Sequence, residues 1–301
     1  MEPLIECVPN ISQGRDVGVI DLLWGAVAGI PGCRALHRDA DPDHNRTVFT
    51  LAGTPAGMET AAAALVRAAA GLIDLTRHRG VHPRMGAVDV VPFVPLKGAT
   101  MADCAALARR AGARIWREAG VPVFLYEQAA SAPHRQNLAD IRRGGFEGLF
   151  DKVNTPGWTP DFGGAFAHPT AGATAVGARP PLLAFNLTLD TADADVARRI
   201  ARAIRQRDGG LPGVKALGLY LASRGRAQVS CNLVDIDAAP PLLVLRAAER
   251  EAARLGAGVE DTEIVGLTLR RALPDDAVHV LRLRGFDPTV QVLDDLLGLA
   301  L

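Results

Sequence analysis

The pattern of apolar and polar positions divides the chain into two successive series of strands and helices. Short apolar runs in the first series are typical of buried strands, and the segments between them carry apolar residues at helical spacing. In the longest such segment, residues 55–77, Met58, Leu65 and Leu72 recur on one stripe. The expected elements are strands at 4–8, 33–36, 47–52, 88–94 and 121–125 and helices at 16–30, 55–77 and 101–119. Taken in chain order, the first six of these elements, from 4–8 to 88–94, follow the order β-α-β-β-α-β.

The second series repeats this order. Its clearest strand is 226–234, where every second residue from Ala227 to Leu233 is apolar, as on a half-buried strand. The other expected elements are strands at 182–189, 214–221 and 263–267, a helix through Val196 and Ile204 that Gly209-Gly210 ends, and a helix ending at Leu255. Two β-α-β-β-α-β units predict an α+β protein of two tandem ferredoxin-like sandwiches, with domains at 1–178 and 179–301. The Gly/Pro-rich segment 154–181 is too long for a passive linker, so we expect a functional loop there.

Composition excludes several classes of protein. The 301 residues suffice for about two domains, and 49% of them are apolar, so a core is available. Basic and acidic residues balance at 33 each, which argues against a nucleic acid or a membrane surface as the main partner. The sequence has no run of about 18 apolar residues and no signal-peptide pattern. The cysteines at 7, 33, 104 and 231 form no CxxC pair, which predicts reduced thiols in a cytoplasmic protein, without a disulfide framework or zinc site.

The segment 81–87, with the sequence VHPRMGA, places a histidine where acid–base chemistry can take place. Pro83 stops the preceding helical pattern, and Gly86 frees the backbone before the apolar run 88–94. We therefore expect His82 on a short loop at the mouth of a strand, part-exposed and titrating near neutral pH, as a general acid or base requires. The alternative is a structural histidine that bonds to the backbone.

A second candidate segment, 39–47, groups Asp39, His44 and Arg46 on what we expect to be a loop between two strands. Its opening mimics a calcium loop, but His44 replaces the required glycine and Thr50 stands where a bidentate Glu is needed. Carboxylates, an imidazole and a guanidinium on one loop suit a charged, nitrogen-rich substrate better. The alternative is a solvated turn closed by an Asx cap.

A third candidate segment, 161–174, is rich in glycine and flanked by aromatic residues. Its glycines would let the backbone approach a flat ligand, and Trp158, Phe162 and Phe166 offer ring faces. The segment lacks GxGxxG or Walker spacing, so a nucleotide phosphate site is not expected. The alternative is a loop whose glycines only serve its turns. The residues predicted to contact a ligand are Gly163, Gly164, Ala165, Phe166, Ala167, His168, Pro169, Thr170, Ala171 and Gly172.

These segments together resemble the formiminotransferase family. The motifs that carry the resemblance are ECVPN with Ser12 and Gly14-Arg15 (6–15), NRTV (45–48), HPRMGAVD (82–89), PDFG (160–163), GAR (177–179), AFN (184–186) and AQVS with Asn232-Leu233 (227–233). The match runs from about residue 2 to residue 273. Several independent motifs in the right order make it far more specific than any one of them.

The resemblance implies two ferredoxin-like subdomains with folate in the groove between them, and a homodimer. It implies transfer of a formimino group from N-formiminoglutamate to N5 of tetrahydrofolate in histidine breakdown, with His82 as the catalytic acid/base and the stretch 163–172 in the folate site. The cyclodeaminase that is fused to mammalian members is expected to be absent. Gln13 departs from the Glu that the family often has, and Ala165, Ala167 and Thr170-Ala171 replace bulkier residues.

The chemistry needs a base for the incoming amine and an acid for the departing glutamate amine, and one imidazole can serve both. We expect Asp39 to hold the amidinium and orient His82. Arg46 and Arg84 are the candidates for pairing with the carboxylates of the substrate, with His44 beside them. No metal or covalent intermediate is required. Two alternatives stay open: a formyltransferase that uses N-formylglutamate, and a non-catalytic tandem ferredoxin-like module that binds a small ligand.

Overall fold

The structure is a computed structural model that describes residues 2–299. The chain divides between Pro180 and Pro181 into two units, each with its own sheet and its own buried core. Both units mix helices and strands, so the prediction of a mixed α and β protein is confirmed. Within the described residues, no helix is long and apolar enough to cross a membrane.

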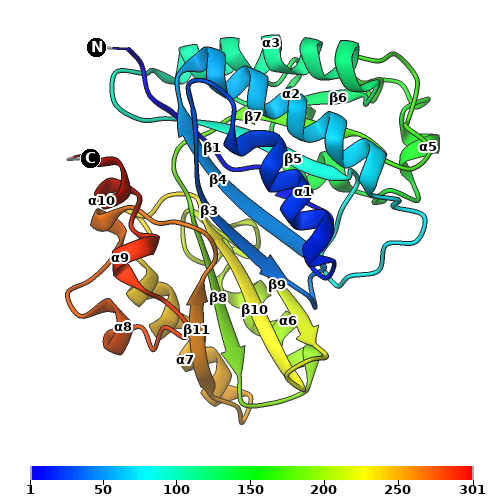
Figure 1. Ribbon diagram of the computed structural model, residues 1–301. Helices are drawn as coiled ribbons and strands as arrows, with labels where there is room; N and C mark the ends of the chain where they lie inside the picture. The colour runs from blue at the N-terminus through cyan, green and yellow to red at the C-terminus, as the bar shows by residue number, and fades with distance from the viewer. Residues whose placement is uncertain (1, 300–301) are drawn as a thin grey trace. The chain divides into compact units, whose positions relative to one another are not determined.

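The first unit contains a seven-stranded sheet with an interrupted strand near its middle (Figure 1). The short strands β1 (Ile5–Cys7) and β2 (Asn10–Ile11) both lie between β4 (Arg46–Gly53) and β5 (Val88–Pro95), antiparallel to each. β3 (Cys33–Asp41) continues the sheet beyond β4 as an antiparallel hairpin partner. On the other side, β7 (Thr174–Ala178) and then β6 (Val123–Glu127) add to β5 in parallel.

Three long helices cover one face of this sheet, and Figure 1 shows them side by side. Each begins at a residue whose side chain caps the first turn: Asp16, Thr54 and Thr100. Their apolar faces pack with the inward residues of the strands, Phe49, Phe93 and others, into the largest core cluster. The helices are α1 (Val17–Ala28), α2 (Pro55–Leu72) and α3 (Met101–Ala119).

The other face of β5, β6 and β7 is covered by the segment that follows β6. This segment contains three short helices, η1 (Pro133–Arg135), α4 (Leu138–Arg142) and α5 (Leu149–Lys152). Ile141, Leu149 and Val153 pack here with Val90, Ala175 and Phe124 of the strands. The sheet is therefore buried on both faces at β5 and β7, where the candidate residues of the HPRMG motif enter it.

Several predicted boundaries were wrong for local reasons. The helix expected over 55–77 ends at Leu72, because Ile73 is extended and Asp74 closes an Asx turn by accepting from the backbone N–H of Thr76 at 3.0 Å. β3 extends to Asp41, beyond the predicted 33–36, after a bulge between Ala35 and His37. The connecting segment 154–181 contains the buried strand β7 and is thus part of the first core.

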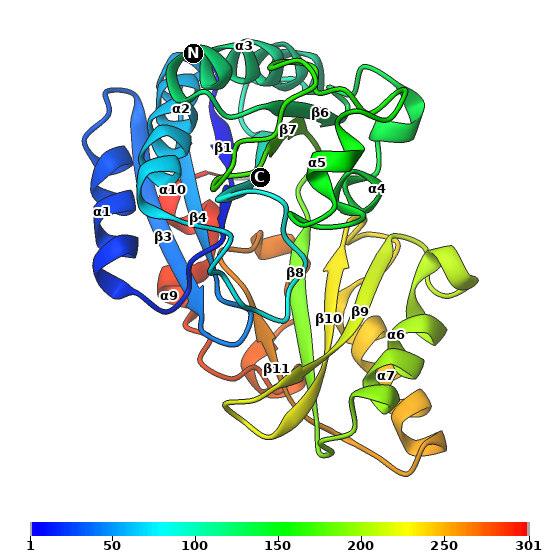
Figure 2. The ribbon, with the colours of Figure 1, turned by 90° about the vertical axis from the view of Figure 1, so that its right-hand side faces the viewer.

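The second unit is a four-stranded antiparallel sheet in the order β11-β8-β10-β9, covered on one face by α6 and α7 (Figure 2). Its last strand lies at 259–264 rather than the predicted 263–267, and a 3-10 turn at Gln206–Asp208 separates α6 from Gly209. The elements are β8 (Leu183–Leu189), α6 (Ala194–Ile204), β9 (Val214–Leu221), β10 (Arg226–Leu233), α7 (Pro241–Arg254) and β11 (Val259–Ile264). After β11 come η3 (Arg270–Ala272), α8 (Ala277–Val280), α9 (Pro288–Gln291) and α10 (Leu293–Leu297).

Candidate active site

The segment that carries His82 is held to the rest of the first unit by backbone hydrogen bonds. The N–H of Ala87 donates to the carbonyl oxygen of Ala171 at 2.9 Å, and the hydroxyl of Ser12 donates to that of Gly86 at 2.7 Å. A Cβ at Gly86 would lie 2.1 Å from the carbonyl oxygen of Ala173, so only glycine allows this close approach. His82 therefore lies on a tethered segment at the entry of β5, as the sequence predicted.

Asp89 is the fully buried carboxylate of the site, and a β-bulge sets its direction. Asn10 pairs with Val90 and Ile11 with Val88, which leaves Asp89 as the extra residue of β5. One carboxylate oxygen accepts from the N–H of Met85 at 2.9 Å. The other lies 2.8 Å from Nη2 of Arg46 and 2.5 Å from Nη2 of Arg142. Burial raises the pKa of Asp89, but Arg142 and Arg46 outweigh it and hold that pKa below its usual value, so Asp89 is ionised.

Arg46, at the start of β4, connects this carboxylate to His82. Its Nη2 donates to Asp89, its Nε donates to the side-chain oxygen of Asn10 at 2.9 Å, and its Nη1 lies 2.7 Å from Nδ1 of His82. Burial lowers the pKa of Arg46 to about 10, with Asp89 acting in the opposite direction. The guanidinium is thus charged at neutral pH, and each of its three nitrogens has a partner within the protein.

Two groups reach the same nitrogen of the His82 ring. Besides Nη1 of Arg46, the carbonyl oxygen of Pro83 lies 2.8 Å from Nδ1. A guanidinium only donates and a carbonyl only accepts, so the two contacts suit different states of the ring. When Nδ1 accepts from Arg46, the proton of the neutral ring is on Nε2. When Nδ1–H donates to Pro83, Nε2 carries the lone pair. In both states Nδ1 is engaged, and Nε2 is the nitrogen that a substrate would meet.

The environment of His82 favours its neutral form. Burial, then the positive charges of Arg46 and Arg142, hold the pKa of His82 well below its usual value. Titration near neutral pH was expected from the sequence, whereas burial and then the two nearby guanidinium groups lower the pKa of His82. His82 is therefore neutral at pH 7.

His44 lies beside His82, with 5.7 Å between the ring centroids. It belongs to a tight turn in which one carboxylate oxygen of Asp41 accepts from the N–H groups of Asp43 and His44, both at 2.8 Å. The Asx cap that was the alternative for this loop is therefore present. Within the part of the chain that the structure describes, no group of three or more His, Cys, Asp or Glu residues is arranged to hold a metal ion.

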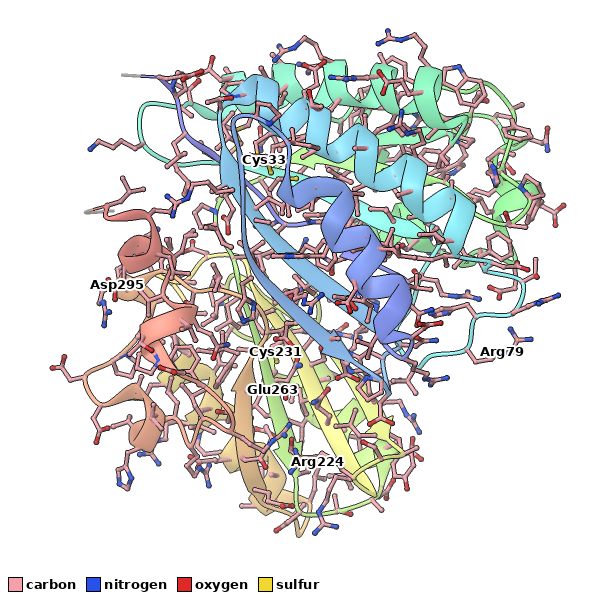
Figure 3. All side chains as sticks on the ribbon, in the orientation of Figure 1. Cys33, Arg79, Arg224, Cys231, Glu263 and Asp295 are labelled. Carbon is pink, nitrogen blue, oxygen red and sulfur yellow. The ribbon has the colours of Figure 1, made fainter. Side chains whose placement is uncertain are left out.

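A third histidine, His78, holds the segment in place through two hydrogen bonds. Its Nε2 lies 2.9 Å from the carbonyl oxygen of Asn45, and its Nδ1 accepts from Nε of Arg84 at 3.1 Å. Asn45 has a positive φ of 49° and donates from its side chain to the carbonyl oxygen of Arg79 at 2.9 Å. Arg79 itself lies on the exposed part of the segment (Figure 3). These bonds tie the turn at 42–45 to the segment that carries His82.

Comparison with known proteins identifies the family. A model of the formiminotransferase domain, N-terminal subdomain, matches residues 4–179, and a model of the formiminotransferase domain matches residues 184–285. The chain belongs to the formiminotransferase family. It is 45% identical over 299 residues to a glutamate formimidoyltransferase of Streptococcus pyogenes serotype M1, covering 99% of this chain and 100% of that protein.

Other members of the formiminotransferase family are almost as similar. A glutamate formimidoyltransferase of Thermoplasma acidophilum is 42% identical over 286 residues, which is 94% of each protein. A formimidoyltransferase-cyclodeaminase of Sus scrofa is 44% identical over 283 residues, 92% of this chain and 52% of that protein. The chain thus spans about half the length of this relative.

The structure brings together only part of the site that the sequence predicted. His82, His44 and Arg46 are neighbours, but Arg46 is buried and fully partnered within the protein, so it is poorly suited to hold a substrate carboxylate. Arg84 makes a bidentate pair with Glu147, at 2.8 and 2.7 Å, which also removes it from that role. Both arginines therefore already have partners within the first unit.

Asp39 was expected to orient His82. It lies on β3, paired in register with Val48, and its charge acts on His37. The carboxylate linked to His82 through Arg46 is Asp89. Asp89 lies within the HPRMGAVD motif, and a lone carboxylate inside an apolar strand is the signal of a buried ion pair. Arg142 gave no such signal, because its distance from His82 is set by the tertiary fold.

The glycine-rich loop 163–172 is built into the first unit at both ends. His168 Nδ1 accepts from the N–H of Ala171 at 3.0 Å, and a Cβ at Gly172 would lie 2.0 Å from the carbonyl oxygen of Met85. Gly172 thus serves chain packing, and replacing it would damage the fold. The middle of the loop differs. A Cβ placed at Gly164 would meet no atom within 4 Å, and Phe166 is 42% exposed. Trp158 and Phe162 pack inside the unit instead.

Proposed function

We propose that the protein is a one-carbon-group transferase that moves the formimino group from N-formimino-L-glutamate to N5 of tetrahydrofolate. Its family membership and the names of its full-length relatives support this reaction. The observation that carries the proposal is a neutral imidazole, His82, on a tethered segment beside Arg46, which is itself paired with Asp89. Such a group is what an amine nucleophile and an amine leaving group both require.

In the proposed mechanism, N5 of tetrahydrofolate attacks the amidine carbon of the donor. Nε2 of His82 takes the proton from N5 as the new C–N bond forms, while Nδ1–H donates to the carbonyl oxygen of Pro83. The tetrahedral centre then collapses with cleavage of the bond to the glutamate nitrogen. His82 returns its proton to that nitrogen, and glutamate leaves as the amine. The low pKa of His82 makes the imidazolium a strong acid for this second transfer.

The folate ring is proposed to lie against the middle of the loop 163–172. Gly164, Ala165 and Phe166 are exposed, and Phe166 is supported from behind by Trp116, with ring centroids 6.2 Å apart. An exposed phenylalanine that is already supported loses little entropy on stacking with a planar pterin. The remainder of the predicted folate set, including His168 and Gly172, would shape the loop rather than touch the ligand.

Phe166→Ala tests this placement. We expect a several-fold rise in KM for tetrahydrofolate with kcat nearly unchanged, because stacking with an aromatic side chain is worth about 0.5–1.5 kcal/mol. Phe150→Ala is the matched control, since Phe150 is 40% exposed and also packs against another aromatic ring, Phe146. An equal effect of the two substitutions would remove Phe166 from the folate site.

The reaction itself is tested with purified protein and two donors. We expect transfer from N-formiminoglutamate to tetrahydrofolate, detected as 5-formiminotetrahydrofolate, with a kcat/KM well above that for N-formylglutamate. Preference for N-formylglutamate would support the formyltransferase alternative. Binding of glutamate and folate without turnover of either donor would support a ligand-binding module.

The order of the strands in the two sheets bears on the proposed fold. Counting β1 and β2 as one strand, the β-α-β-β-α-β part of the first unit has its fourth, first, third and second strands adjacent in that order, and the second unit has the same order. This order supports two ferredoxin-like sandwiches.

The cellular location and the oligomeric state are also proposals. All four cysteines are buried free thiols, Cys33 and Cys231 among them (Figure 3), which supports a location in the reducing cytoplasm. A homodimer is proposed from the family, and light scattering would test it.

A further inference from the structure

Arg142 occupies a fixed position at the end of α4. Nζ of Lys152 donates to the carbonyl oxygens of Asp140 and Ile141, both at 2.6 Å, and the N–H of Gly145 donates to that of Arg142 at 2.8 Å. Burial lowers the pKa of Lys152 to about 8, so the ammonium is still mostly charged at pH 7. Hydrogen bonds therefore hold the last turn of α4 in place, and the Arg142 side chain extends from a fixed backbone.

The cluster that contains Arg142 has more positive than negative charge. Asp89 supplies one carboxylate, and both Arg46 and Arg142 share it, so with neutral His82 the cluster has one net positive charge. The Arg84–Glu147 pair nearby is neutral and adds nothing to this balance. Unbalanced charge at a partly desolvated position is costly unless an anion pairs with it.

Arg142 is also the arginine of the cluster whose N–H donors are not all used. Its side chain is only 16% exposed, and its Nε is buried with no hydrogen-bond partner among residues 2–299. The contact with Asp89 uses Nη2. By contrast, Arg46 uses all three nitrogens and Arg84 is held by Glu147 and His78. A buried polar atom without a partner is rare in a folded protein and calls for an explanation.

We propose that Arg142 binds a carboxylate of the glutamyl donor next to His82. The proposal rests on the proposed function, because it takes the donor to be a glutamate derivative. A planar guanidinium with unused N–H groups matches a carboxylate, and the bound anion would neutralise the cluster. The glutamyl tail of tetrahydrofolate has the same chemistry, so the experiment must separate the two sources. The assignment fills the role for which Arg46 and Arg84 proved unsuited.

The test compares Arg142→Gln with Arg143→Gln, a neighbour that is 79% exposed and pairs with Asp140. For Arg142→Gln we expect KM for N-formiminoglutamate to rise about 10- to 100-fold, as loss of a charge-assisted hydrogen bond predicts. Calorimetry should show glutamate binding weakened by a similar factor. KM for tetrahydrofolate should stay within about twofold, and Arg143→Gln should behave as wild type. Arg142→Lys, which keeps the charge, should recover part of the loss.

Formamidine, an amidine donor with no carboxylate, separates binding from an indirect effect. If Arg142 acts on the carboxylate, Arg142→Gln should reduce the slow transfer from formamidine far less than it reduces transfer from N-formiminoglutamate at limiting donor. Equal losses with both donors would overturn the proposal, since Arg142 would then act through Asp89 and His82. A rise confined to KM for tetrahydrofolate would also overturn it, in favour of the folate tail. Failure of wild type to use N-formiminoglutamate would refute the proposed function instead, and glutamate calorimetry would still decide the role of Arg142.

Discussion

At the scale of single residues, the site is organised around one nitrogen. Nδ1 of His82 lies within hydrogen-bond distance of Arg46 and of the carbonyl oxygen of Pro83, which leaves Nε2 for the proposed proton transfer. Arg46 holds the ring when Nδ1 accepts from it, and its charge adds to burial in lowering the pKa of His82. A lower pKa makes His82 a weaker base but keeps it unprotonated at neutral pH. The proposed reaction needs a proton acceptor first, so this environment suits its opening step.

His82→Ala is expected to lower kcat by at least about two orders of magnitude, because a positioned general acid–base group contributes about 10²–10⁴-fold. The KM values should change little, since the imidazole moves protons and supplies little ground-state binding. Steady-state kinetics on a variant shown to be folded by circular dichroism would measure this. Turnover close to wild type would mean that another group transfers the proton.

The pH profile should report the pKa of His82 and its dependence on Arg46. His82 acts when neutral, so kcat/KM should fall on acidification only below the usual imidazole pKa of 6.5. Arg46→Gln removes a charge that lowers this pKa, so the acid limb should move to higher pH. Burial remains, so the limb should stay below 6.5. Arg38→Gln, which breaks the exposed pair with Asp21, is the control and should leave the limb in place.

At the scale of elements, the sequence predicted what is determined locally. The helix over 101–119 was predicted with its observed bounds, because Thr100 and Asp103 form a capping box and Gly120 ends the helix in a left-handed conformation. The helix over 55–77 was predicted too long, because Leu75 continues the apolar pattern while its backbone bonds to Thr170. The buried strand β7 was missed, since its partners β5 and β6 lie far away in sequence.

The same limit applies to the candidate site. The HPRMGAVD motif located His82 and contained Asp89, but the bulge that turns Asp89 toward Arg46 depends on pairing with β2. Arg46 and Arg84 were predicted to pair with the substrate carboxylates because a guanidinium suits a carboxylate. Sequence alone gave no means of knowing that Asp89 and Glu147 already hold them. Residue type could be predicted from the motif, whereas availability for a ligand depends on tertiary partners.

The bulge in β5 is expected to be important for stability as well as for the site. Asp89→Asn keeps an acceptor for the N–H of Met85 but leaves two guanidinium groups without their counter-ion. We expect a loss of about 3–5 kcal/mol in the free energy of unfolding, the usual cost of breaking a buried ion pair. Urea unfolding at neutral pH would measure it. Asp21→Asn, at an exposed pair, should cost less than about 1 kcal/mol, and equal losses would contradict this account.

At the scale of the whole molecule, the chain is two structural units with separate cores. The family models divide between residues 179 and 184, and the structure divides after Pro180. The N–H of Arg179 donates to the carbonyl oxygen of Phe93 in β5, so hydrogen bonding to the first sheet continues as far as Arg179. The chain therefore completes the first sheet, by inserting β7 between β5 and β6, just before it starts the second unit.

Fragments cut on either side of β7 test this organisation. Residues 1–180 contain the whole first sheet, and residues 181–301 contain the second sheet with its own core, so each fragment is expected to unfold cooperatively in urea. Residues 1–172 lack β7, which leaves β5 and β6 without their shared partner and exposes the residues that β7 buries. We expect this shorter fragment to show no cooperative transition and to bind a hydrophobic dye. Cooperative unfolding of 1–172 with the midpoint of 1–180 would show that β7 is dispensable, and the first unit would then end at β6.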